Sequence, residues 1–502
     1  MRLSDLLRET DLQGEVGRGE DWSFALADSP VAGVALDSSK VLPGFVFAAL
    51  PGRSTHGALF ARNARASGAI AVVTDLRGRE LIGDIDLPVL VVANPRATVA
   101  KLAAALSGDP ARNLTMIGVT GTNGKTTVTH LVQAGLVDAG IRCGIVGTLG
   151  SALPGFPEVM HARTTPEAPD LHQSLKWMLD HGAQAVSMEV SSIALRECRV
   201  DAIKFDIAAF TGLTQDHLDY HGTMQAYFEA KAELFTPERA RSAVVVVDDA
   251  WGRALMDRAS IPITTVSSVD RSADWFVSRS KGLVSIQGPE AVQVELPIPT
   301  DFATTNVAVA VSVCHLLGVP ARMSAQSAVN ARIPGRMEVV KSIGDIEFIV
   351  DYAHTPDAIH KVVMAARASR KSEHSRVIVV VGAGGDRDAS KREEMGQAAS
   401  RDSDVLFITD DNPRSEDPAE IRAALMRGAN ASDGDVWEVA SRDEAIERAV
   451  DEAAPGDIVL VLGKGHETTQ EVGGHVLAFD DRLVLASFVQ RRFGGGEEGE
   501  QR

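Results

Sequence analysis

The segment GVTGTNGKTT (118–127) contains the residue types that bind a nucleotide phosphate. It stands between an apolar run typical of a strand and a stretch typical of a helix. Glycines there let backbone N–H groups point at a phosphate, and the N-terminus of a helix favours negative charge. Lys125 can place its charge beside the β- and γ-phosphates, and the Thr126 hydroxyl can bind Mg²⁺. The sequence therefore predicts an ATP loop.

This loop departs from the general phosphate-loop pattern at one position. The pattern requires a glycine where the chain has Val119, and the nearest glycine is Gly118. A glycine-rich turn that binds nothing is the alternative, although the strand, the lysine and the threonines stand in the order that phosphate binding needs. Nucleotide binding alone leaves kinases, GTPases, helicases and ligases open, because a shared fold does not fix the reaction.

Three further polar residues stand close to predicted elements. Glu189 ends one apolar run, His217 follows another, and Lys231 lies in the helical stretch 224–235. Because the carboxyl ends of parallel strands meet at one edge of a sheet, Glu189 and His217 are candidate metal ligands. A solvated carboxylate, a structural histidine and a salt-bridged helix lysine are the alternatives that these residues alone leave open.

The elements that must position these groups alternate along the chain. Short β-branched runs are followed by glycine-rich or polar turns and then by helical stretches. Runs that are apolar throughout suit parallel strands buried on both faces. The sequence therefore predicts an α/β fold with doubly wound, mostly parallel sheets. The clearest predicted strands lie at 116–121, 185–190, 376–384, 405–411 and 457–463.

The chain divides into three predicted domains. The first ends where Pro95 breaks the pattern, and the third begins after the proline-glycine break 333–336, which suits a hinge. An alternating stretch at 274–296 predicts an antiparallel ribbon inside the second domain. The glycine- and glutamate-rich tail from about residue 494 is predicted to be disordered. The predicted domains are 1–95, 96–336 and 337–502.

Composition argues against several classes of function. The formal charge of −18 disfavours general binding to nucleic acid or anionic membranes, although a local basic pocket stays possible. No stretch approaches ~18 uninterrupted apolar residues, and the N-terminus has no apolar signal region. The three cysteines are far apart and in apolar contexts, as in reduced cytosolic proteins. We therefore expect a cytoplasmic protein without membrane insertion or nucleic-acid binding.

The form TGTNGKTT (120–127) resembles the ATP loop of the Mur ligases and the related folylpolyglutamate synthases. Eight further motifs resemble those of the MurE type of Mur ligase and stand in the family's order, which chance would hardly produce. These motifs are MEVSS (188–192), DHLDYHG (216–222), YFEAKAELF (227–235), PGRME (334–338), DYAHTPD (351–357), GGDRD (384–388), DNPR (411–414) and GKGHE (463–467).

The resemblance implies an enzyme with a small N-terminal α/β UDP-binding domain, a central ATP-binding domain and a Rossmann-like C-terminal domain. The implied reaction joins a diamino acid to UDP-N-acetylmuramoyl-L-alanyl-D-glutamate through an acyl phosphate, in cytoplasmic peptidoglycan synthesis. Cell-wall formation, cell shape and cell division would depend on it. ATP, Mg²⁺ and CO₂, the last as a lysine carbamate, are the implied cofactors, and we expect a monomer.

The same resemblance carries site residues over by position. The implied catalytic residues are Lys125, Glu189, His217 and Lys231, and the implied metal ligands are Thr126, Glu189, His217 and carbamylated Lys231. The implied ATP contacts are Gly121, Thr122, Asn123, Gly124, Lys125, Thr126, Thr127, Asn306, Arg336, Asp351 and His354. The implied contacts to the UDP-muramoyl peptide are Leu36, Ser38, Arg53, Ser54, Thr55, Thr164, Thr165, Ser191 and Arg199. The implied amino-acid contacts are Arg387, Asp411, Asn412, Arg414, Gly463 and Glu467.

Lys231 must meet a physical condition, and several other residues of this set have simpler interpretations. Lys231 must be partly desolvated or near a metal, because carbamylation needs a neutral amine. The loops 36–40 and 50–57 are also compatible with ordinary turn chemistry. Thr165 is also a candidate N-terminal signal for the next helix, with Pro166 in its first turn.

The sequence DNPR resembles the type that adds meso-diaminopimelate, because lysine-adding relatives typically lack an arginine at Arg414. A lysine-adding ligase is one alternative, and it differs only in the amino-acid pocket. A folylpolyglutamate synthase would lack the UDP domain and DNPR. A non-catalytic nucleotide-binding protein would not need Lys231, Glu189 and His217 together.

Four positions depart from the family pattern. Ile193 replaces a histidine, Glu197 a glutamine, Gly212 an asparagine and Glu393 a proline. The first three lie near the positions implied to hold the muramoyl peptide or the metals. Since no implied metal ligand is lost, we expect an active enzyme.

Overall fold

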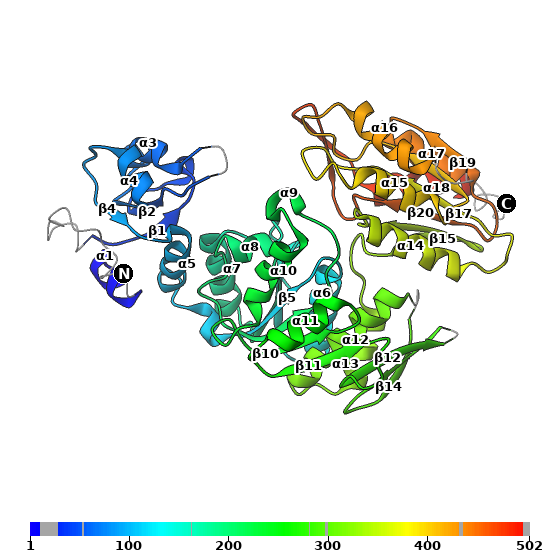
Figure 1. The fold of residues 1–502 in the computed structure, drawn as a ribbon, viewed down its shortest axis with the longest axis horizontal. Coiled ribbons are helices and arrows are strands. Elements are labelled where there is room, and N and C mark those ends of the chain that lie inside the picture. The colour runs from blue at the N-terminus through cyan, green and yellow to red at the C-terminus, as the bar shows by residue number, and fades with distance from the viewer. Residues whose placement is uncertain are drawn as a thin grey trace, which may run out of the picture.

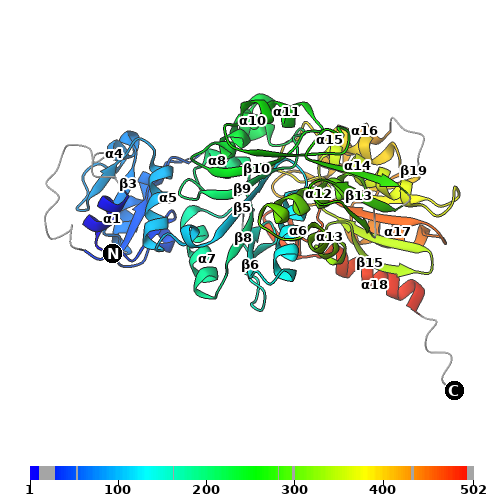
Figure 2. The same cartoon turned by 90° about the horizontal axis from the view of Figure 1, so that it is seen from below.

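The computed structural model describes residues 1–10, 29–52, 55–161, 163–280, 282–296, 300–430 and 435–494. Within these residues, three large sheets follow one another along the chain. The first and third sheets lie at opposite ends of an elongated molecule, with the central sheet between them (Figures 1 and 2). Helices pack on the sheet faces, so the predicted α/β fold class is confirmed.

The first sheet has four parallel strands in the order β1-β2-β3-β4. Helix α5 begins at Pro95, and the Asn94 side chain caps it by accepting a hydrogen bond from Ala97 N. Val99 and Leu102 of this helix join the core of the first sheet. The elements are β1 (Gly33–Ala35), β2 (Phe45–Ala48), β3 (Ala71–Thr74), β4 (Val89–Val91), α1 (Leu3–Glu9), α3 (Ala61–Ala66), α4 (Leu76–Ile82) and α5 (Pro95–Leu106).

The central sheet has the strand order β14-β13-β12-β11-β10-β9-β5-β8-β6-β7. The strands from β12 through β6 in this order pair in parallel, and β7, β13 and β14 are antiparallel additions. The ribbon predicted at 274–296 is thus confirmed as β12–β14. The strands are β5 (Thr115–Thr120), β6 (Cys143–Gly147), β7 (Gly150–Ala152), β8 (Ala185–Glu189), β9 (Phe205–Phe210), β10 (Ala240–Val246), β11 (Ile263–Ser267), β12 (Trp275–Ser280), β13 (Leu283–Gln287) and β14 (Val292–Glu295).

Helices cover both faces of the central sheet. Helices α6, α12 and α13 pack on the face that includes Ile117 and Val119. Helices α7, α8 and α10 pack on the face that includes Met116. The helices are α6 (Lys125–Asp138), α7 (Ala168–Asp180), α8 (Ser192–Arg196), α9 (Leu218–His221), α10 (Met224–Ala232), α11 (Ala250–Arg258), α12 (Asp301–Leu316) and α13 (Ala321–Asn330). This is the doubly wound arrangement that the sequence predicted.

The third sheet has the order β15-β16-β20-β17-β18-β19, and only β15 is antiparallel to its neighbour. All five residues of β17 are buried, because Val377 and Val379 face one helix layer while Ile378 and Val380 face the other. Burying one such side chain contributes about 1.5–3 kcal/mol. The strands are β15 (Glu338–Ile343), β16 (Ile346–Asp351), β17 (Val377–Val381), β18 (Val405–Ile408), β19 (Asp435–Glu438) and β20 (Ile458–Leu462), and a separate hairpin contains β21 (Thr469–Val472) and β22 (His475–Ala478).

Helices α14, α15 and α16 cover one face of this sheet, and α17 and α18 cover the other. They are α14 (Pro356–Ser369), α15 (Arg392–Ser400), α16 (Pro418–Ala429), α17 (Arg442–Glu452) and α18 (Asp481–Phe493). The tail predicted to be disordered lies outside the described residues, apart from Gly494. None of the helices in the described part of the chain is long and apolar enough to cross a bilayer.

Candidate active site

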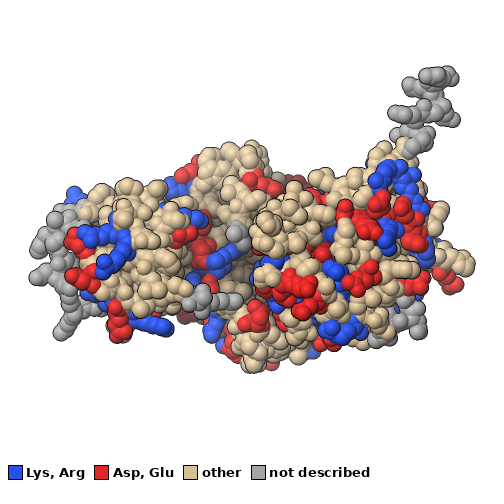
Figure 3. Space-filling view, turned by 90° about the horizontal axis from the view of Figure 1, so that it is seen from above, with Lys and Arg blue, Asp and Glu red and all other residues tan. Residues whose placement is uncertain are grey.

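One cavity of about 2850 Å³ is lined by residues from all three sheet regions. Ligand pockets for single small molecules are usually ~300–1,000 Å³, so this cavity can hold several substrates together. Figure 3 shows a hollow between the N-terminal part and the rest of the molecule, with Lys and Arg side chains inside it. Every described residue that the sequence predicted for a binding site lines this cavity except Gly121. Arg53 and Ser54 lie outside the described residues.

The predicted ATP loop joins β5 to α6. Lys125 is the first residue of α6, and its ammonium donates to the carbonyl oxygens of Gly121 (3.1 Å) and Thr122 (2.9 Å). Gly124 has φ +86°, and a Cβ there would stand 2.6 Å from Asn306 Oδ1, so glycine is required for this close approach. Asn306 of α12 thus lies directly against Gly124 of the predicted ATP loop.

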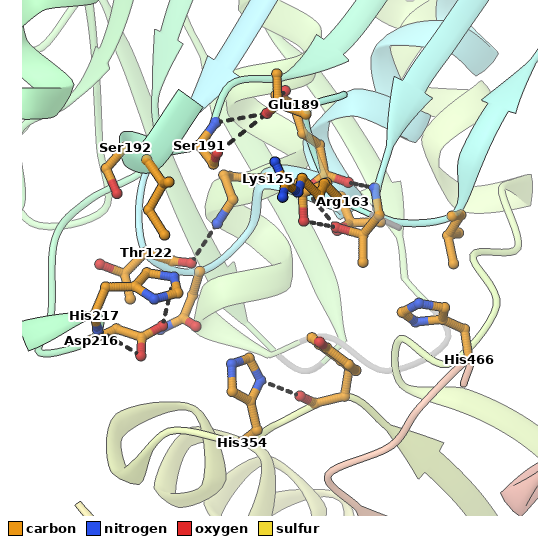
Figure 4. Close-up of a pocket in the computed structure, with 18 of the residues that line it drawn as sticks. Thr122, Lys125, Arg163, Glu189, Ser191, Ser192, Asp216, His217, His354 and His466 are labelled. Atoms are coloured by element: carbon orange, nitrogen blue, oxygen red, sulfur yellow. Dashed lines mark hydrogen bonds and ion pairs between the residues drawn. The ribbon is translucent and has the colours of Figure 1, made fainter. Parts of the chain in front are cut away.

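Glu189 ends β8, which pairs directly with β5. Its side chain is buried, and its carboxylate accepts hydrogen bonds from Thr148 N (2.8 Å) and Thr148 Oγ1 (3.2 Å). Burial lowers the pKa of Lys125, and the nearby carboxylates of Glu189 and Asp216 oppose that shift. Figure 4 shows Lys125 and Glu189 on one side of the pocket, with His354 and His466 on the other side.

Lys231 is a buried lysine of α10 with 1% of its surface exposed. The Thr223 side chain caps this helix, and Lys231 Nζ donates to Gly121 O at 2.8 Å. Burial and the charge of Lys125 hold the pKa of Lys231 well below its ordinary value. The desolvation that carbamylation requires is therefore present at this lysine.

The residues predicted to hold Mg²⁺ gather around the ATP loop without forming a metal site of ordinary side chains. Within the described residues, no three His, Cys, Asp or Glu side chains form a group that could hold a metal ion. The predicted set has only two such residues, Glu189 and His217. With the Thr126 hydroxyl and a carbamate on Lys231, its donors would be mostly oxygen, which fits the preference of Mg²⁺.

Contacts between the central and third sheet regions meet at the ATP loop. Arg336, from the predicted hinge, donates from Nη2 to Thr126 Oγ1 at 2.8 Å and lies 4.4 Å from the Tyr352 ring centroid. Asn123 Nδ2 donates to Asp357 Oδ2 at 3.2 Å. Lys391 Nζ lies 3.3 Å from Asp216 Oδ1. These contacts place the third sheet region over the phosphate loop.

Asp351 ends β16, His354 follows it, and both line the same cleft. The Asp351 carboxylate accepts from the backbone N–H groups of Met337 (2.7 Å) and Ala353 (2.8 Å), and burial raises its pKa. Burial lowers the pKa of His354 to about 4, so its imidazole is neutral at pH 7. A neutral imidazole and a carboxylate here suit the hydrogen-bonding groups of a nucleoside better than a phosphate.

Thr165, a residue predicted to bind the peptide, is joined by hydrogen bonds to Ser191, another such residue, and to the backbone of Glu189. Thr165 Oγ1 donates to Glu189 O at 2.9 Å and accepts from Ser191 N at 3.1 Å. The prediction that Thr165 begins the next helix is wrong, because α7 starts at Ala168 and these two hydrogen bonds occupy the Thr165 hydroxyl.

Arg199 belongs to a cluster of charges that the sequence did not indicate. Its Nη2 lies 2.5 Å from Glu197 Oε2 and 3.1 Å from Glu167 Oε1, and its Nη1 donates to Thr165 O. Arg96 of α5 reaches the same Glu197 oxygen at 3.4 Å. Glu197, one of the four departures, therefore ties helix α5 to Arg199, a residue predicted to bind substrate.

The other three departures have different surroundings. Gly212 has φ +112°, a conformation that favours glycine, and its carbonyl accepts from Thr122 N. Ile193 lines the cavity from α8. Glu393 pairs with Arg427 in an exposed ion pair and does not line the cavity.

The predicted amino-acid residues come together where β17, β18 and β20 end. Asn412 Nδ2 donates to Glu467 Oε2 at 2.7 Å. Arg414 has φ +54° and donates from Nη1 to Gly385 O at 2.6 Å. Its Nε lies 3.6 Å from Glu471 Oε2. Arg387, Asp411 and Gly463 line the same part of the cavity. The six predicted residues include two arginines and two acids, which suits a ligand that carries both charges.

Sequence reasoning missed two lysines of this region. Lys464 is fully buried and contacts Asn412 and Glu467, and Lys391 reaches across to Asp216. Although burial alone would raise the pKa of Asp216, His217 and Lys391 lower it. Lys464 stands inside the GKGHE motif, so a charged residue directly after an apolar strand was the available signal.

Three family models match this chain. They are the Mur ligase middle domain over residues 119–314, the Mur ligase glutamate ligase domain over residues 335–465, and the Mur ligase family catalytic domain over residues 30–107.

Relatives match nearly the whole chain. A UDP-N-acetylmuramoyl-L-alanyl-D-glutamate–2,6-diaminopimelate ligase of Streptomyces coelicolor is 42% identical, over 92% of this chain and 93% of that protein. A UDP-N-acetylmuramyl-tripeptide synthetase of Leifsonia xyli subsp. xyli is 40% identical, over 91% of both chains. A solved structure of a UDP-N-acetylmuramoyl-L-alanyl-D-glutamate–2,6-diaminopimelate ligase is 31% identical, with a TM-score of 0.67 over 98% of this chain and 99% of that one.

Proposed function

The chain belongs to the Mur ligase family, and we propose that it joins meso-2,6-diaminopimelate to UDP-N-acetylmuramoyl-L-alanyl-D-glutamate at the expense of ATP. The observation that carries this proposal is the single cavity shared by three groups of residues. The ATP loop, the Arg199 cluster and the Arg414–Glu467 cluster all line it. A reaction with three substrates needs this convergence.

Amide formation in water requires an activated carboxylate. The carboxylate of the muramoyl dipeptide attacks the γ-phosphorus of ATP, which gives an acyl phosphate and ADP. The amine of the diamino acid then attacks the acyl carbon, and phosphate leaves. The residues of the cleft must orient these groups and exclude water.

Lys125 would stabilise the negative charge that develops on the transferred phosphoryl group. Thr126, Glu189, His217 and a carbamate on Lys231 would hold Mg²⁺, which neutralises charge on the phosphates when it is bound. Buried Lys231 can form that carbamate, because its neutral amine attacks CO₂ and releases a proton. The loop residues from Gly121 to Thr127 would direct N–H groups and hydroxyls at the phosphates.

The third sheet region would deliver the amine. Arg336 already reaches Thr126, so a bound γ-phosphate would give its guanidinium a stronger partner. Asn306, Asp351 and His354 would contact the nucleoside where the two regions meet. Lys391 and Asp216 would help to hold this closed arrangement.

The amino-acid pocket supports a diamino diacid over lysine. The two substrates differ by one carboxylate, and the Arg414 guanidinium can bind that group through paired hydrogen bonds. Lysine would leave this cation without a partner. Glu467 and Asn412 would take the ammonium and carboxylate of the other end, with Arg387, Asp411 and Gly463 around them.

The N-terminal region would hold the UDP part of the acceptor. Leu36, Ser38 and Thr55 line the cavity there, and Arg53 and Ser54 complete the set proposed from the sequence. Thr164, Thr165, Ser191 and Arg199 would hold the peptide part. We assign these roles to domains 1–95, 96–336 and 337–502 of a cytoplasmic, monomeric enzyme of peptidoglycan synthesis, on which cell shape and division would depend.

Phosphate release tests this proposal. Purified protein with Mg²⁺ and ATP should release phosphate only when the UDP-muramoyl dipeptide and meso-diaminopimelate are both present. Equal turnover with a folate and glutamate, or release that does not need the dipeptide, would refute the assignment.

A further inference from the structure

Lys464 is a buried cation for which the proposed function provides no role. It directly follows Gly463 at the end of β20, and none of its surface is exposed. Its ammonium donates to Asn412 Oδ1 (3.2 Å), Glu467 Oε2 (3.3 Å) and Thr469 O (2.6 Å). An ammonium has three donors, so all of them are used inside the protein. Lys464 therefore cannot touch a substrate, and any effect must pass through its partners.

The first partner is the Asn412 amide, whose orientation is fixed on one side. Its Oδ1 accepts from Lys464 Nζ and also from Glu471 N at 2.9 Å. An amide turned the other way would place its NH₂ group against two donors and lose both bonds. Because Oδ1 is held there, Nδ2 is directed at Glu467 Oε2, 2.7 Å away.

The second partner is Glu467. Both bonds, from Lys464 and from Asn412, fall on Oε2, and within the described residues no hydrogen bond falls on Oε1. Glu467 lines the cavity, so a ligand can reach it. Burial and the charge of Asp411 raise the pKa of Glu467, whereas Lys464 opposes that shift. The lysine thus favours the ionised form, which can pair with an ammonium group.

The third partner is the backbone carbonyl of Thr469, and Thr469 is the first residue of β21. The same strand contains Glu471, whose carbonyl accepts from Arg414 N at 3.0 Å. Lys464 therefore anchors the strand that holds Arg414 as well as the pair Asn412–Glu467. This one buried charge thus joins the loop after β18, the loop after β20 and the first residue of β21.

We propose that Lys464 is a positioning residue of the amino-acid site: it fixes the Asn412 amide and the Glu467 carboxylate so that Glu467 receives an ammonium group of the incoming diamino acid. The inference rests on the proposed function, because it assumes that this cluster binds the amino acid. Lys464 acts on the amino acid only through the residues that it contacts.

The test compares Lys464→Met with wild type in the phosphate-release assay. Methionine is an unbranched side chain one atom shorter than lysine, so it can stay buried while the charge and the donors are removed. Hydrogen bonds to charged groups are strong enough that the loss of one changes a binding constant by about tenfold to hundredfold. The KM for meso-diaminopimelate should rise by that factor, while the KM values for ATP and for the UDP-muramoyl dipeptide stay within about twofold of wild type.

Two further variants show whether the charge matters. Lys371→Met is the matched control, because Lys371 forms only an exposed ion pair with Asp345 on the same sheet region, and it should leave every KM unchanged. Combining Lys464→Met with Glu467→Gln should add little to the KM effect of Glu467→Gln alone. Full additivity of the two effects would overturn the proposal.

Folding is checked by thermal unfolding of each variant. If Lys464→Met does not fold, Lys464→Gln replaces it with the same expected result, since glutamine is polar but uncharged. A glutamine variant that also fails to fold, or one in which all three KM values rise alike, would make Lys464 a residue of the core only. Wild type that is inactive with meso-diaminopimelate would instead refute the proposed function, so the two failures are distinguishable.

Discussion

The predicted ATP loop and the proposed amino-acid pocket both lie at the carboxyl ends of parallel strands, yet different contacts hold them. Lys125 is held by carbonyl groups of residues three and four positions earlier in the chain. Asn412 and Glu467 are 55 positions apart and meet only through side chains. A site held by local backbone leaves a compact motif in the sequence, whereas a site held across loops depends on the whole fold. The two regions should therefore respond differently to substitution.

The largest effect is expected at Lys125. Lys125→Ala removes the cation beside the transferred phosphoryl group, and comparable electrostatic contacts are worth about 10²–10³ in rate. Phosphate release at saturating substrates should fall by at least that factor, with little change in the KM for the amino acid. Activity within tenfold of wild type would show that this loop does not act on the γ-phosphate.

Lys231 should be nearly as sensitive, for a different reason. Lys231→Ala removes the proposed carbamate, and the variant should lose about 10² in rate. Formate or acetate should restore part of the activity by supplying a small carboxylate, and a crystal structure of wild type should show Lys231 extended by a carboxylate. Full activity of the alanine variant would show that Lys231 has only a structural role.

Arg414→Ala tests the other region and should act on binding. Losing a charge-assisted pair costs about 1.5–3 kcal/mol, so the KM for meso-diaminopimelate should rise roughly tenfold to hundredfold. ATP and the UDP-muramoyl dipeptide should bind as before, since Arg414 is held by Gly385 and the β21 strand. An unchanged KM for meso-diaminopimelate would show that Arg414 does not determine the amino-acid specificity.

The smallest effect is expected at Glu197. Glu197→Gln should lower the KM for the UDP-muramoyl dipeptide by about two- to fivefold, because the partly exposed pair with Arg96 is worth only about 0–1 kcal/mol and the pair with buried Arg199 is also removed. The substitution frees Arg199 and removes a negative charge near an anionic substrate. Glu233→Gln, which breaks the nearby surface pair with Arg196, is the matched control. A raised KM would mean that Glu197 mainly positions Arg199.

The sequence allowed prediction of what local patterns encode. Apolar runs located the strands that end at Glu189 and Leu462, and the alternating stretch 274–296 located the antiparallel ribbon. Side-chain contacts between distant residues were not predictable. The link from Arg96 through Glu197 to Arg199, and the burial of Lys464, depend on how separate segments pack. The prediction that Thr165 begins a helix was wrong, because its hydroxyl donates a hydrogen bond to the last residue of β8. No local sequence pattern encodes this contact.

We infer above all that this chain attaches a diamino diacid to the UDP-muramoyl dipeptide. The most direct measurement supplies wild-type protein with ATP, Mg²⁺, the dipeptide and equal concentrations of meso-diaminopimelate and L-lysine, and identifies the product by mass spectrometry. We predict that nearly all product contains diaminopimelate. Product that contains mainly lysine, or no tripeptide product at all, would refute this inference.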